Sequence, residues 1–357
     1  MTTSTLTARS PSLDRELPDE LAQRATVAAL MTGGKGVLAA DESPSTLEKR
    51  FKAIAVLSTE ASRRDYRAVL LSTPRLNDAI SGVILQDETI RQAIGGVPIP
   101  AWLEAQGIVP GIKVDGGTVD LAHFAGEKIT QGLDGLRGRL AVYRQLGARF
   151  TKWRAVITVG EVLPTRACLA ANARAMALFA ARSQEAGLVP VVEPEVLMDG
   201  RHTLARCEEV TREALEVVFA ALSEHRVSLE AMVLKTGMVL AGSDCPRQAD
   251  VGTVAEVTLR CLRRAAPAAV GGILFLSGGQ TEVAATVRLN AICAHHDPTW
   301  PLSFSFGRAL QESALKAWQG LAANAGAAQA ALRHRAGCNG LAVRGKYTAE
   351  AEQANEA

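Results

Sequence analysis

Three features are scarce in this 357-residue sequence, and each shortage excludes a class of protein. The 39 basic side chains nearly balance the 37 acidic ones, and a net charge of +2 predicts neither a nucleic-acid nor a membrane partner. No apolar run approaches the roughly 20 residues that a membrane-spanning helix needs. The six cysteines are scattered without a CxxC pair, which favours a reducing cytoplasm where they serve as small core residues.

The composition that remains is that of a globular protein with a large core. Hydrophobic residues make up 48% of the chain and charged residues 21%. Residues 1–16 include a Ser- and Thr-rich stretch without the apolar segment of a secretory signal, so we predict a flexible N-terminal leader there. Length alone would suggest two domains, although α/β barrels of this size commonly form a single one.

Short apolar, β-branched segments recur along the chain and alternate with alanine-rich segments of helical period. We predict eight strands, at residues 36–41, 81–86, 109–115, 150–157, 188–197, 231–240, 271–276 and 301–306. The clearest helices are predicted at residues 165–186, 203–224, 253–266 and 308–320. Eight such units favour the α/β class and a single-domain (β/α)8 (TIM) barrel. A doubly wound sheet is the alternative, but the glycine-rich turn at residues 33–36 precedes the first strand instead of following it.

Lys235 is the most unusual residue, because it lies inside the apolar segment at residues 231–240. A lysine is rarely buried without a partner, and a desolvated ammonium group favours the neutral, nucleophilic amine. Two interpretations are open from this segment alone. The lysine either reaches water from an edge strand, or it is a buried nucleophile.

Other polar residues stand at the C-terminal ends of the predicted strands, where barrel enzymes carry their catalytic groups. Several come in pairs two residues apart, which places both side chains on one face of a strand. We predict that they share the barrel mouth with Lys235; they are Asp41, Lys113, Asp115, Lys152, Arg154, Glu193, Glu195, Ser277 and Arg308. A second cation at Lys152 would further favour the neutral amine of Lys235, and Glu193, Glu195 and Asp41 would move protons. A Schiff base formed on this amine would break a carbon–carbon bond without a metal or an organic cofactor.

Two groups of residues are candidate anion sites. The Ser277-Gly278-Gly279 turn and Arg308 follow the last two strands, where this fold frequently binds phosphate. The turn alone would be an ordinary strand-to-helix connection, and Arg308 is what favours a phosphate site. Lys113 and Arg154, with Ser43 and Thr46, form the second group. Two anion sites flanking one amine indicate a bisphosphorylated sugar.

At this point the chain resembles the class I fructose-bisphosphate aldolases from about residue 17 to residue 348. Any one of the matching motifs is weak, but eight in the family's order are specific. They are GKGVLAADES at residues 34–43, GIKVD at 111–115, TQGLDGL at 130–136, KWR at 152–154, VEPE at 192–195, VLK at 233–235, FLSGGQ at 275–280 and FSFGRALQ at 304–311.

The resemblance implies a barrel over residues 17–343 and reversible cleavage of fructose 1,6-bisphosphate into dihydroxyacetone phosphate and glyceraldehyde 3-phosphate. It implies a Schiff base on Lys235, acid–base work by Glu193, assistance by Asp41 and Lys152, and orientation of Lys235 and Glu193 by Glu195. It places the 1-phosphate at Ser277, Gly278, Gly307 and Arg308, and the 6-phosphate near Lys113, Arg154, Ser43, Thr46 and Arg50. It also implies a cytoplasmic glycolytic and gluconeogenic enzyme, commonly a homotetramer, with no metal and no cofactor.

Several alternatives stay open. The same chemistry would serve fructose 1-phosphate or sedoheptulose 1,7-bisphosphate, and a barrel of this family would also serve as a non-enzymatic scaffold through basic faces such as residues 260–264. The chain departs from the vertebrate pattern at its end, where we predict that residues 344–357 form a short mobile tail without a terminal tyrosine. Tyr347 would replace that tyrosine only if the tail folded back to the mouth.

Overall fold

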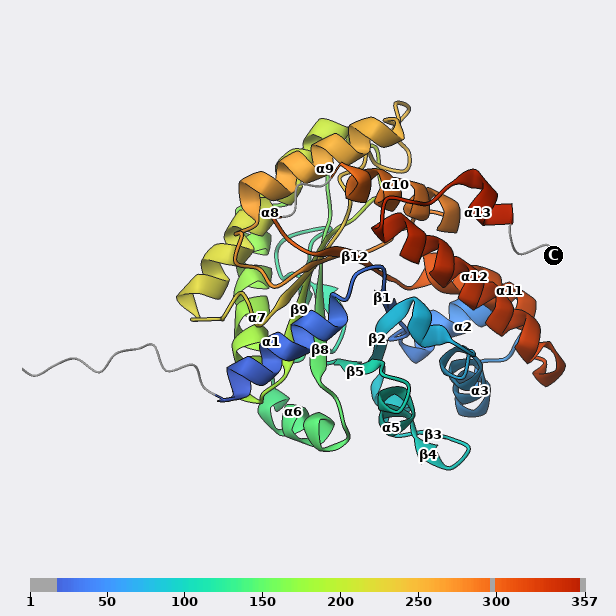
Figure 1. Ribbon diagram of the computed structural model, residues 1–357. Helices are drawn as coiled ribbons and strands as arrows, with labels where there is room; N and C mark the ends of the chain where they lie inside the picture. Colours follow the sequence, from blue (N-terminus) through green and yellow to red (C-terminus); the bar gives the residue numbers. More distant parts are fainter. Residues whose placement is uncertain (1–17, 296–298, 354–357) are drawn as a thin grey trace, which may run out of the picture.

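Eight parallel strands form a closed barrel at the centre of the molecule (Figure 1). The computed structural model describes residues 18–295 and 299–353, so the predicted leader at residues 1–16 lies outside the described residues. Around the barrel the strand order is β1 (Gly36–Ala39), β12 (Leu302–Phe306), β11 (Ile273–Phe275), β10 (Val233–Thr236), β9 (Val189–Val196), β8 (Phe150–Ile157), β5 (Val109–Lys113) and β2 (Ile80–Leu85). The predicted (β/α)8 architecture is therefore confirmed, and the doubly wound sheet is excluded.

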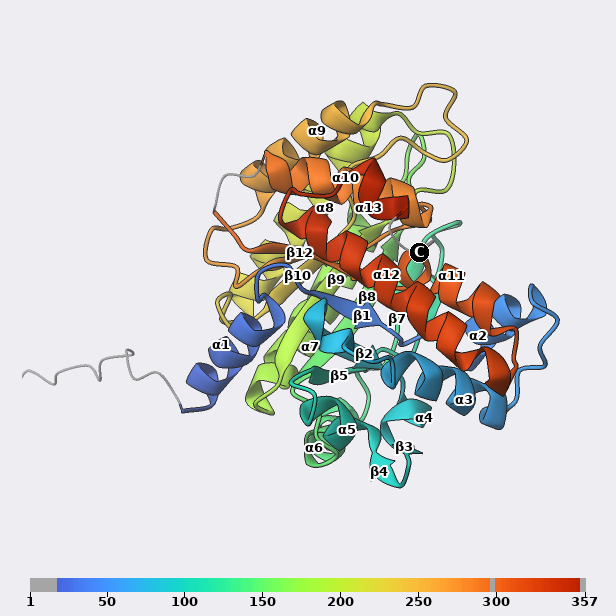
Figure 2. The same cartoon turned by 45° about the vertical axis from the view of Figure 1, so that its right-hand side comes forward.

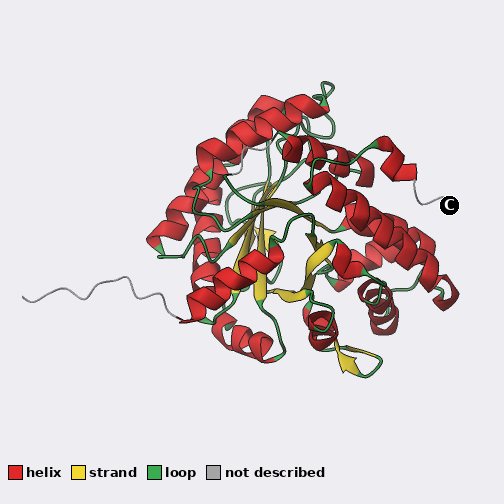
Figure 3. Ribbon diagram, in the orientation of Figure 1, coloured by secondary structure: helices red, strands yellow, loops and turns green. Residues whose placement is uncertain are grey.

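Helices cover the outside of the barrel in a ring (Figure 3). They are α2 (Pro44–Lys52), α3 (Glu60–Leu71), α4 (Asp87–Ile90), α5 (Ile99–Glu104), α6 (Leu136–Gln145), α7 (Arg166–Glu185), α8 (Leu204–Glu224), α9 (Val251–Ala265), α10 (Glu282–Ala294) and α11 (Arg308–Trp318). Thr165 and Thr203 cap α7 and α8 as predicted, because each side chain accepts a hydrogen bond from a backbone N–H three residues on. Helix α9 starts before the predicted Thr253, since Asp250 caps it and accepts from the N–H of Thr253.

Three further helices, α1, α12 and α13, complete the fold. Helix α1 (Pro18–Leu30) lies across the N-terminal end of the barrel, and α12 (Ala325–Val343) packs beside α10, α11 and α3 (Figure 2). The short helix α13 (Ala349–Gln353) follows α12. Two small antiparallel sheets, β3–β4 (Ala93–Ile94, Val97–Pro98) and β6–β7 (Thr118–Asp120, Lys128–Thr130), project from the loops. No helix in these described ranges combines the length and the apolar character that a bilayer crossing requires.

The strand predictions hold at all eight positions, although β10 is shorter than predicted. The apolar segment at residues 231–240 pairs with its neighbours only from Val233 to Thr236. Beyond that point Met238 and Val239 are buried in a loop, where the N–H of Val239 donates to the Thr258 hydroxyl of α9. An apolar segment in a sequence indicates which residues are buried. The strand itself ends where its ladder of backbone hydrogen bonds ends.

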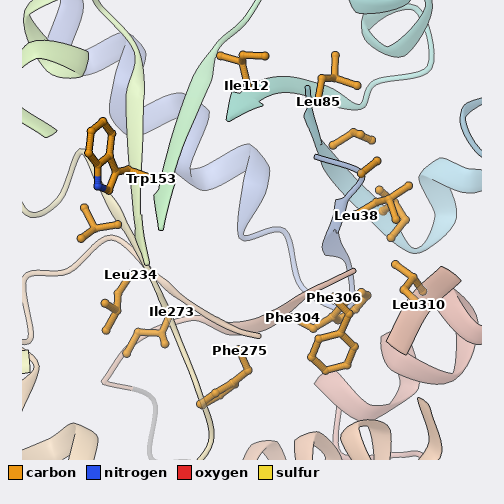
Figure 4. Packing of buried hydrophobic residues seen from close by; sticks show 14 of the residues in the cluster. Leu38, Leu85, Ile112, Trp153, Leu234, Ile273, Phe275, Phe304, Phe306 and Leu310 are labelled. Atoms are coloured by element: carbon orange, nitrogen blue, oxygen red, sulfur yellow. The ribbon is translucent and has the colours of Figure 1, made fainter. Parts of the chain in front are cut away.

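The strands alternate between two apolar environments. Side chains that point outward, such as Leu38, Trp153, Leu234 and Phe304, fill the layer between the strands and the surrounding helices (Figure 4). Inward-pointing side chains at the N-terminal end of the barrel form a second cluster of Val37, Ile84, Phe150, Val189, Val191, Val233 and Leu274. Val27 and Leu30 of α1 and Met31, which follows that helix, belong to this cluster and seal it from solvent.

Candidate active site

A cavity of about 770 Å³ opens at the C-terminal end of the barrel. This is the end at which barrel enzymes of this fold carry their chemistry. The cavity is lined by all the residues that the sequence predicts for the site, namely Asp41, Ser43, Thr46, Arg50, Lys113, Lys152, Arg154, Glu193, Glu195, Lys235, Ser277, Gly278, Gly307 and Arg308. The structure therefore brings the whole predicted set together, from seven of the eight strands and the segments that follow them.

The inward positions change character along three strands. Phe150, Val191 and Val233 belong to the apolar inner cluster. Two residues further along β8, β9 and β10, the same faces carry Lys152, Glu193 and Lys235. Successive inward positions of these strands thus form first an apolar layer and then the charged floor of the cavity.

Lys235 is a buried residue of an interior strand, so the edge-strand interpretation is wrong. Strand β10 pairs with β9 on one side and β11 on the other, and the side chain of Lys235 is 4% exposed. Its Nζ lies 3.1 Å from Oε1 of Glu193. The ammonium group therefore has a proton acceptor in direct contact, which is the arrangement that a buried amine needs before it attacks a carbonyl.

Lys235 is the last member of a row of alternating charges. Nζ of Lys152 lies 2.7 Å from the second carboxylate oxygen of Glu193 and 2.9 Å from Oδ2 of Asp41. The sequence Asp41, Lys152, Glu193, Lys235 thus alternates in sign, and all four side chains are buried. The Glu193 carboxylate bridges Lys152 and Lys235, because each of its oxygens faces one of the two ammonium groups.

The alternating charges determine which side chains of the row are ionised. Burial alone would raise the pKa of Asp41, but the charges of Lys152 and Lys235 hold that pKa well below its usual range. The pKa of Glu193 is likewise lowered, because Lys152, Lys235 and Arg154 outweigh its burial. Burial opposes the charge of Lys152, yet Asp41 and Glu193 raise its pKa above the usual value. At neutral pH the row holds two carboxylates around a Lys152 cation.

Glu195 and Asp115 pair with two further cations of the cavity, Arg154 and Lys113. Nε of Arg154 donates to Oε2 of Glu195, and the Lys113 ammonium group donates to Oδ1 of Asp115. The other oxygen of Asp115 accepts from the backbone N–H of Arg154, 3.2 Å away. Arg154 keeps a raised pKa despite its burial, because Glu195 lies beside it. The predicted contact of Glu195 with Lys235 and Glu193 is thus replaced here by an ion pair with Arg154, and its orienting role stays a prediction.

One side of the cavity mouth is built for an anion by β11, β12 and α11. The turn after β11 carries Gly278 and Gly279 with φ values of 49° and 89°, a left-handed backbone that an L side chain rarely adopts. Arg308 is the first residue of α11 and donates to the carbonyl oxygen of Gly279 over 2.6 Å. Glycine N–H groups, a helix N-terminus and a guanidinium group therefore converge there.

The opposite side is formed by α2 with the ends of β5 and β8. Ser43 caps α2, and its hydroxyl lies 3.0 Å from that of Thr46. Arg50 reaches toward the cavity from the same helix and is held by Oε1 of Glu42 at 2.7 Å. Together with Lys113 and Arg154, these groups give the cavity a second cationic wall across from Arg308.

Ser305 and Glu42 are among the cavity-lining residues that the sequence analysis did not predict. Ser305 of β12 lines the cavity and is 1% exposed, and within the part of the chain that the structure describes its hydroxyl has no hydrogen-bond partner. Its position two residues before Gly307, on the inward face, was the available signal. Glu42 holds Arg50 and Arg67 and accepts from Gln311 at 2.9 Å. Nothing in a single sequence points to that role, because its partners lie on α2, α3 and α11.

Tyr347 lies elsewhere in this structure. Its hydroxyl donates to Oε2 of Glu352 at 2.7 Å, and its backbone N–H donates to Asn290 of α10. It does not line the active-site cavity. The tail up to Gln353 therefore rests on the outside of the barrel, and residues 354–357 lie outside the described residues.

Comparison with known proteins agrees with this geometry. Residues 20–357 match the family described as glycolytic fructose-bisphosphate aldolase class-I. The chain is 51% identical over 324 residues to a probable class 1 fructose-bisphosphate aldolase of Xylella fastidiosa, covering 90% of this chain and 97% of that one. It is 46% identical over 342 residues to the fructose-bisphosphate aldolase of Dictyostelium discoideum, covering 95% of each.

A solved structure is similar over almost the same length. The fructose-bisphosphate aldolase of Plasmodium falciparum, in a complex with TRAP and a small-molecule inhibitor, superimposes with a TM-score of 0.91. It shares 44% sequence identity and covers 94% of this chain and 98% of its own. The family match and these similarities both span nearly the whole sequence. The chain belongs to the class I fructose-bisphosphate aldolase family.

Proposed function

We propose that this chain cleaves fructose 1,6-bisphosphate reversibly into dihydroxyacetone phosphate and glyceraldehyde 3-phosphate through a Schiff base on Lys235. The observation that carries the proposal is the buried row from Asp41 to Lys235, open to one cavity with a cationic wall on each side. Family membership supplies the substrate class, and the row supplies the chemistry.

The first step forms the covalent bond. Glu193 accepts a proton from Lys235, and the free amine attacks the C2 carbonyl of the open-chain sugar to give a carbinolamine. Glu193 then returns the proton to the carbinolamine oxygen, water leaves, and a protonated imine remains. The positive charge of the ammonium group is thereby kept on the iminium nitrogen, beside the same carboxylate.

The second step breaks the bond between C3 and C4. The Glu193 carboxylate takes the proton of the C4 hydroxyl, and the electrons of the breaking bond flow to the iminium nitrogen. Glyceraldehyde 3-phosphate leaves, and Lys235 holds an enamine. Lys152 keeps its positive charge between the two carboxylates and stabilises the anionic form of each.

The third step returns the enzyme to its starting state. The enamine takes a proton at C3, and water hydrolyses the resulting iminium to release dihydroxyacetone phosphate. We assign this protonation to Glu193, because its carboxylate is the acid–base group in contact with Lys235. In this arrangement Tyr347, bonded to Glu352, takes no part.

The two cationic walls bind the two phosphates. Arg308 with the Ser277, Gly278 and Gly307 backbone would hold the 1-phosphate, and Lys113, Arg154, Arg50, Ser43 and Thr46 would hold the 6-phosphate. Glu195 would then exchange its ion pair with Arg154 for contacts nearer Lys235.

Borohydride trapping tests the covalent step. Treatment with sodium borohydride in the presence of dihydroxyacetone phosphate should add the reduced substrate to one peptide, that containing Lys235. The K235M variant should give no adduct and no cleavage, and a K316M variant, altered at an exposed lysine of α11, should behave as the parent. Cleavage that a chelator abolishes, with no adduct formed, would overturn the proposal.

Substrate choice is tested by the second wall. With chelator present, kcat/KM for fructose 1,6-bisphosphate should exceed that for fructose 1-phosphate, which leaves the wall at Lys113 and Arg154 empty. A K113Q variant should lower kcat/KM for the bisphosphate while hardly changing that for the monophosphate. Equal losses of kcat/KM with both sugars would show that this wall does not bind the 6-phosphate. Sedoheptulose 1,7-bisphosphate belongs in the same comparison.

The scaffold alternative has less support. The basic face at residues 260–264 is partly neutralised, since Arg260 pairs with Glu208 at 2.7 Å and with Glu256 at 3.5 Å. A solvated helix surface accounts for this pattern. If a partner protein were found, binding retained by K235M without turnover would identify a separate second role.

We further propose a homo-oligomer, with a tetramer favoured, in the cytoplasm. Leu57 and Leu321 are 80% and 55% exposed, and such large apolar side chains form the surface that we assign to a subunit contact. All six cysteines are free thiols, which suits a reducing compartment. Light scattering after size exclusion measures the assembly, and L57E should lower its mass if this surface is an interface.

A further inference from the structure

A second cavity lies at the opposite end of the barrel from the active site. It has a volume of about 490 Å³ and is bordered by Gly34 and Ala79, which precede β1 and β2, and by residues of α12 and α13. His334 and Cys338 of α12 and Ala351 of α13 are part of its wall. Side chains suited to binding a metal ion are therefore open to solvent through a preformed space.

His334 and Cys338 stand four residues apart on α12, so they share one face of that helix. Nε2 of His334 lies 3.7 Å from Sγ of Cys338. In a tetrahedral zinc site with bond lengths of about 2.0 Å to nitrogen and 2.3 Å to sulfur, these two atoms would be about 3.5 Å apart. The pair already has the spacing of two zinc ligands.

A third group reaches the pair from α13. A carboxylate oxygen of Glu352 lies with the other two ligand atoms in a set whose members are all within 4.8 Å of one another. Across residues 18–295 and 299–353 this is the one cluster of three His, Cys or acidic side chains with such spacing. Closing the carboxylate onto a shared ion requires a movement of about 1 Å, when tetrahedral ligand separations are taken as about 3.5 Å.

The Glu352 carboxylate is held in place by two neighbours that are not ligands. Tyr347 donates its hydroxyl proton to Oε2 at 2.7 Å, and Arg335 donates to both oxygens. These are three hydrogen bonds on a group with about four acceptor positions, so one position stays free for a cation. Hydrogen bonds of this kind commonly orient carboxylate ligands around metal ions.

We propose that His334, Cys338 and Glu352 bind one zinc ion, with a water molecule from the cavity as the fourth ligand. Nitrogen, thiolate and carboxylate form a donor set that zinc prefers over magnesium or calcium. On binding, Cys338 releases its thiol proton to solvent and gives up its contact with the carbonyl oxygen of Ala351, now 3.5 Å away.

The zinc ion would join α12 to α13 and so fix residues 349–353 against the barrel. Two of its ligands come from α12 and the third from the segment that ends the described chain. The site shares no residue with the active-site cavity. We therefore expect zinc to stabilise the docked tail without entering the cleavage reaction.

Cobalt and zinc titrations of the full chain, freed of metal by a chelator and then by gel filtration, test the site. Co²⁺ should bind at one equivalent and give a near-ultraviolet thiolate charge-transfer band. Zn²⁺ should remove this band and raise the melting temperature. The C338S and H334Q variants should lose the band or weaken binding at least tenfold, a loss of the size that disturbed metal sites show.

C293S is the matched control, because Cys293 is a partly buried cysteine of α10 outside the cluster, and it should bind as the parent does. Unchanged cleavage of fructose 1,6-bisphosphate would show that each variant is folded. H334Q keeps the test valid if C338S fails to fold. No thiolate band in the parent, or the same band in C338S, would overturn the proposal.

Discussion

The two ends of the barrel interior use the same strands for opposite purposes. At the N-terminal end, Phe150, Val191 and Val233 pack against α1 and exclude water. Two residues further on, Lys152, Glu193 and Lys235 face a cavity of about 770 Å³. The first layer contributes stability through burial, and the second contributes reactivity through charges that are kept close together.

The charged layer depends on the rigidity of the apolar one. A single buried ion loses several kcal/mol of hydration, and only close partners recover that loss. The ion pairs of 2.7 to 3.1 Å along the row require strands that do not shift. The closed barrel and its apolar plug supply that rigidity. We therefore expect changes at one end to affect the rate of cleavage, and changes at the other to affect the free energy of unfolding.

The largest effect is expected from E193Q at the charged end. The amide cannot accept the proton of Lys235, so kcat for fructose 1,6-bisphosphate should fall by about 10²- to 10⁴-fold. Steady-state assays against E209Q, which alters an exposed carboxylate of α8, provide the control. An E193Q enzyme with more than a tenth of the parent kcat would contradict the proton-transfer role.

At the apolar end, L30A should separate stability from rate. Leu30 is fully buried against the inner cluster, and its truncation should lower the free energy of unfolding by about 2–5 kcal/mol. At 25 °C the folded variant should keep the parent kcat. L21A, at a 54% exposed position of the same helix, should change stability by less than about 0.5 kcal/mol in urea titrations. Equal losses in the two variants would mean that α1 does not seal the barrel.

A smaller effect is expected at the rim of the cavity. R308Q should raise KM for fructose 1,6-bisphosphate about 10- to 100-fold, because a charge-assisted phosphate contact is worth about 1.5–3 kcal/mol. R263Q, at an exposed arginine of α9, should leave KM unchanged. If kcat fell and KM stayed constant, Arg308 would act on the transition state instead of binding the phosphate.

The smallest effect is expected from Y347F outside the barrel. Loss of the hydrogen bond to Glu352 should lower stability by about 0.5–1.5 kcal/mol and leave kcat within about twofold of the parent. Denaturant titration and steady-state kinetics measure the two quantities. A tenfold fall in kcat would place the Tyr347 hydroxyl in the mouth during catalysis.

The periodicity of the sequence was sufficient to predict the fold. All eight strands lie within or overlap their predicted segments, because β-branched apolar runs mark strands that are buried on both faces. The end of β10 was not predictable, since Met238 and Val239 are buried in a loop that packs on α9. Helices α1 and α12 were also not predicted. Each covers segments that lie far apart along the chain.

Much of the site was predictable, because polar residues at the ends of apolar strands are unusual enough to notice. The partners of those residues were not. The sequence suggested that Lys152 acts on Lys235, but it did not reveal that the Glu193 carboxylate bridges the two. Likewise Glu195 pairs with Arg154, and Ser305 was overlooked because a serine in a strand is unremarkable. Such pairings depend on side-chain rotamers and strand stagger, which a single sequence does not record.

The alternating row also limits how this enzyme can be redesigned. Neutralising one inner member would leave its buried neighbours with unequal charge, so a single substitution there is expected to fail even where the new side chain fits. Compatible changes would have to come in adjacent pairs of opposite sign, such as Asp41 with Lys152. A library that varies neighbouring positions together would therefore reach functional variants that stepwise mutagenesis would discard.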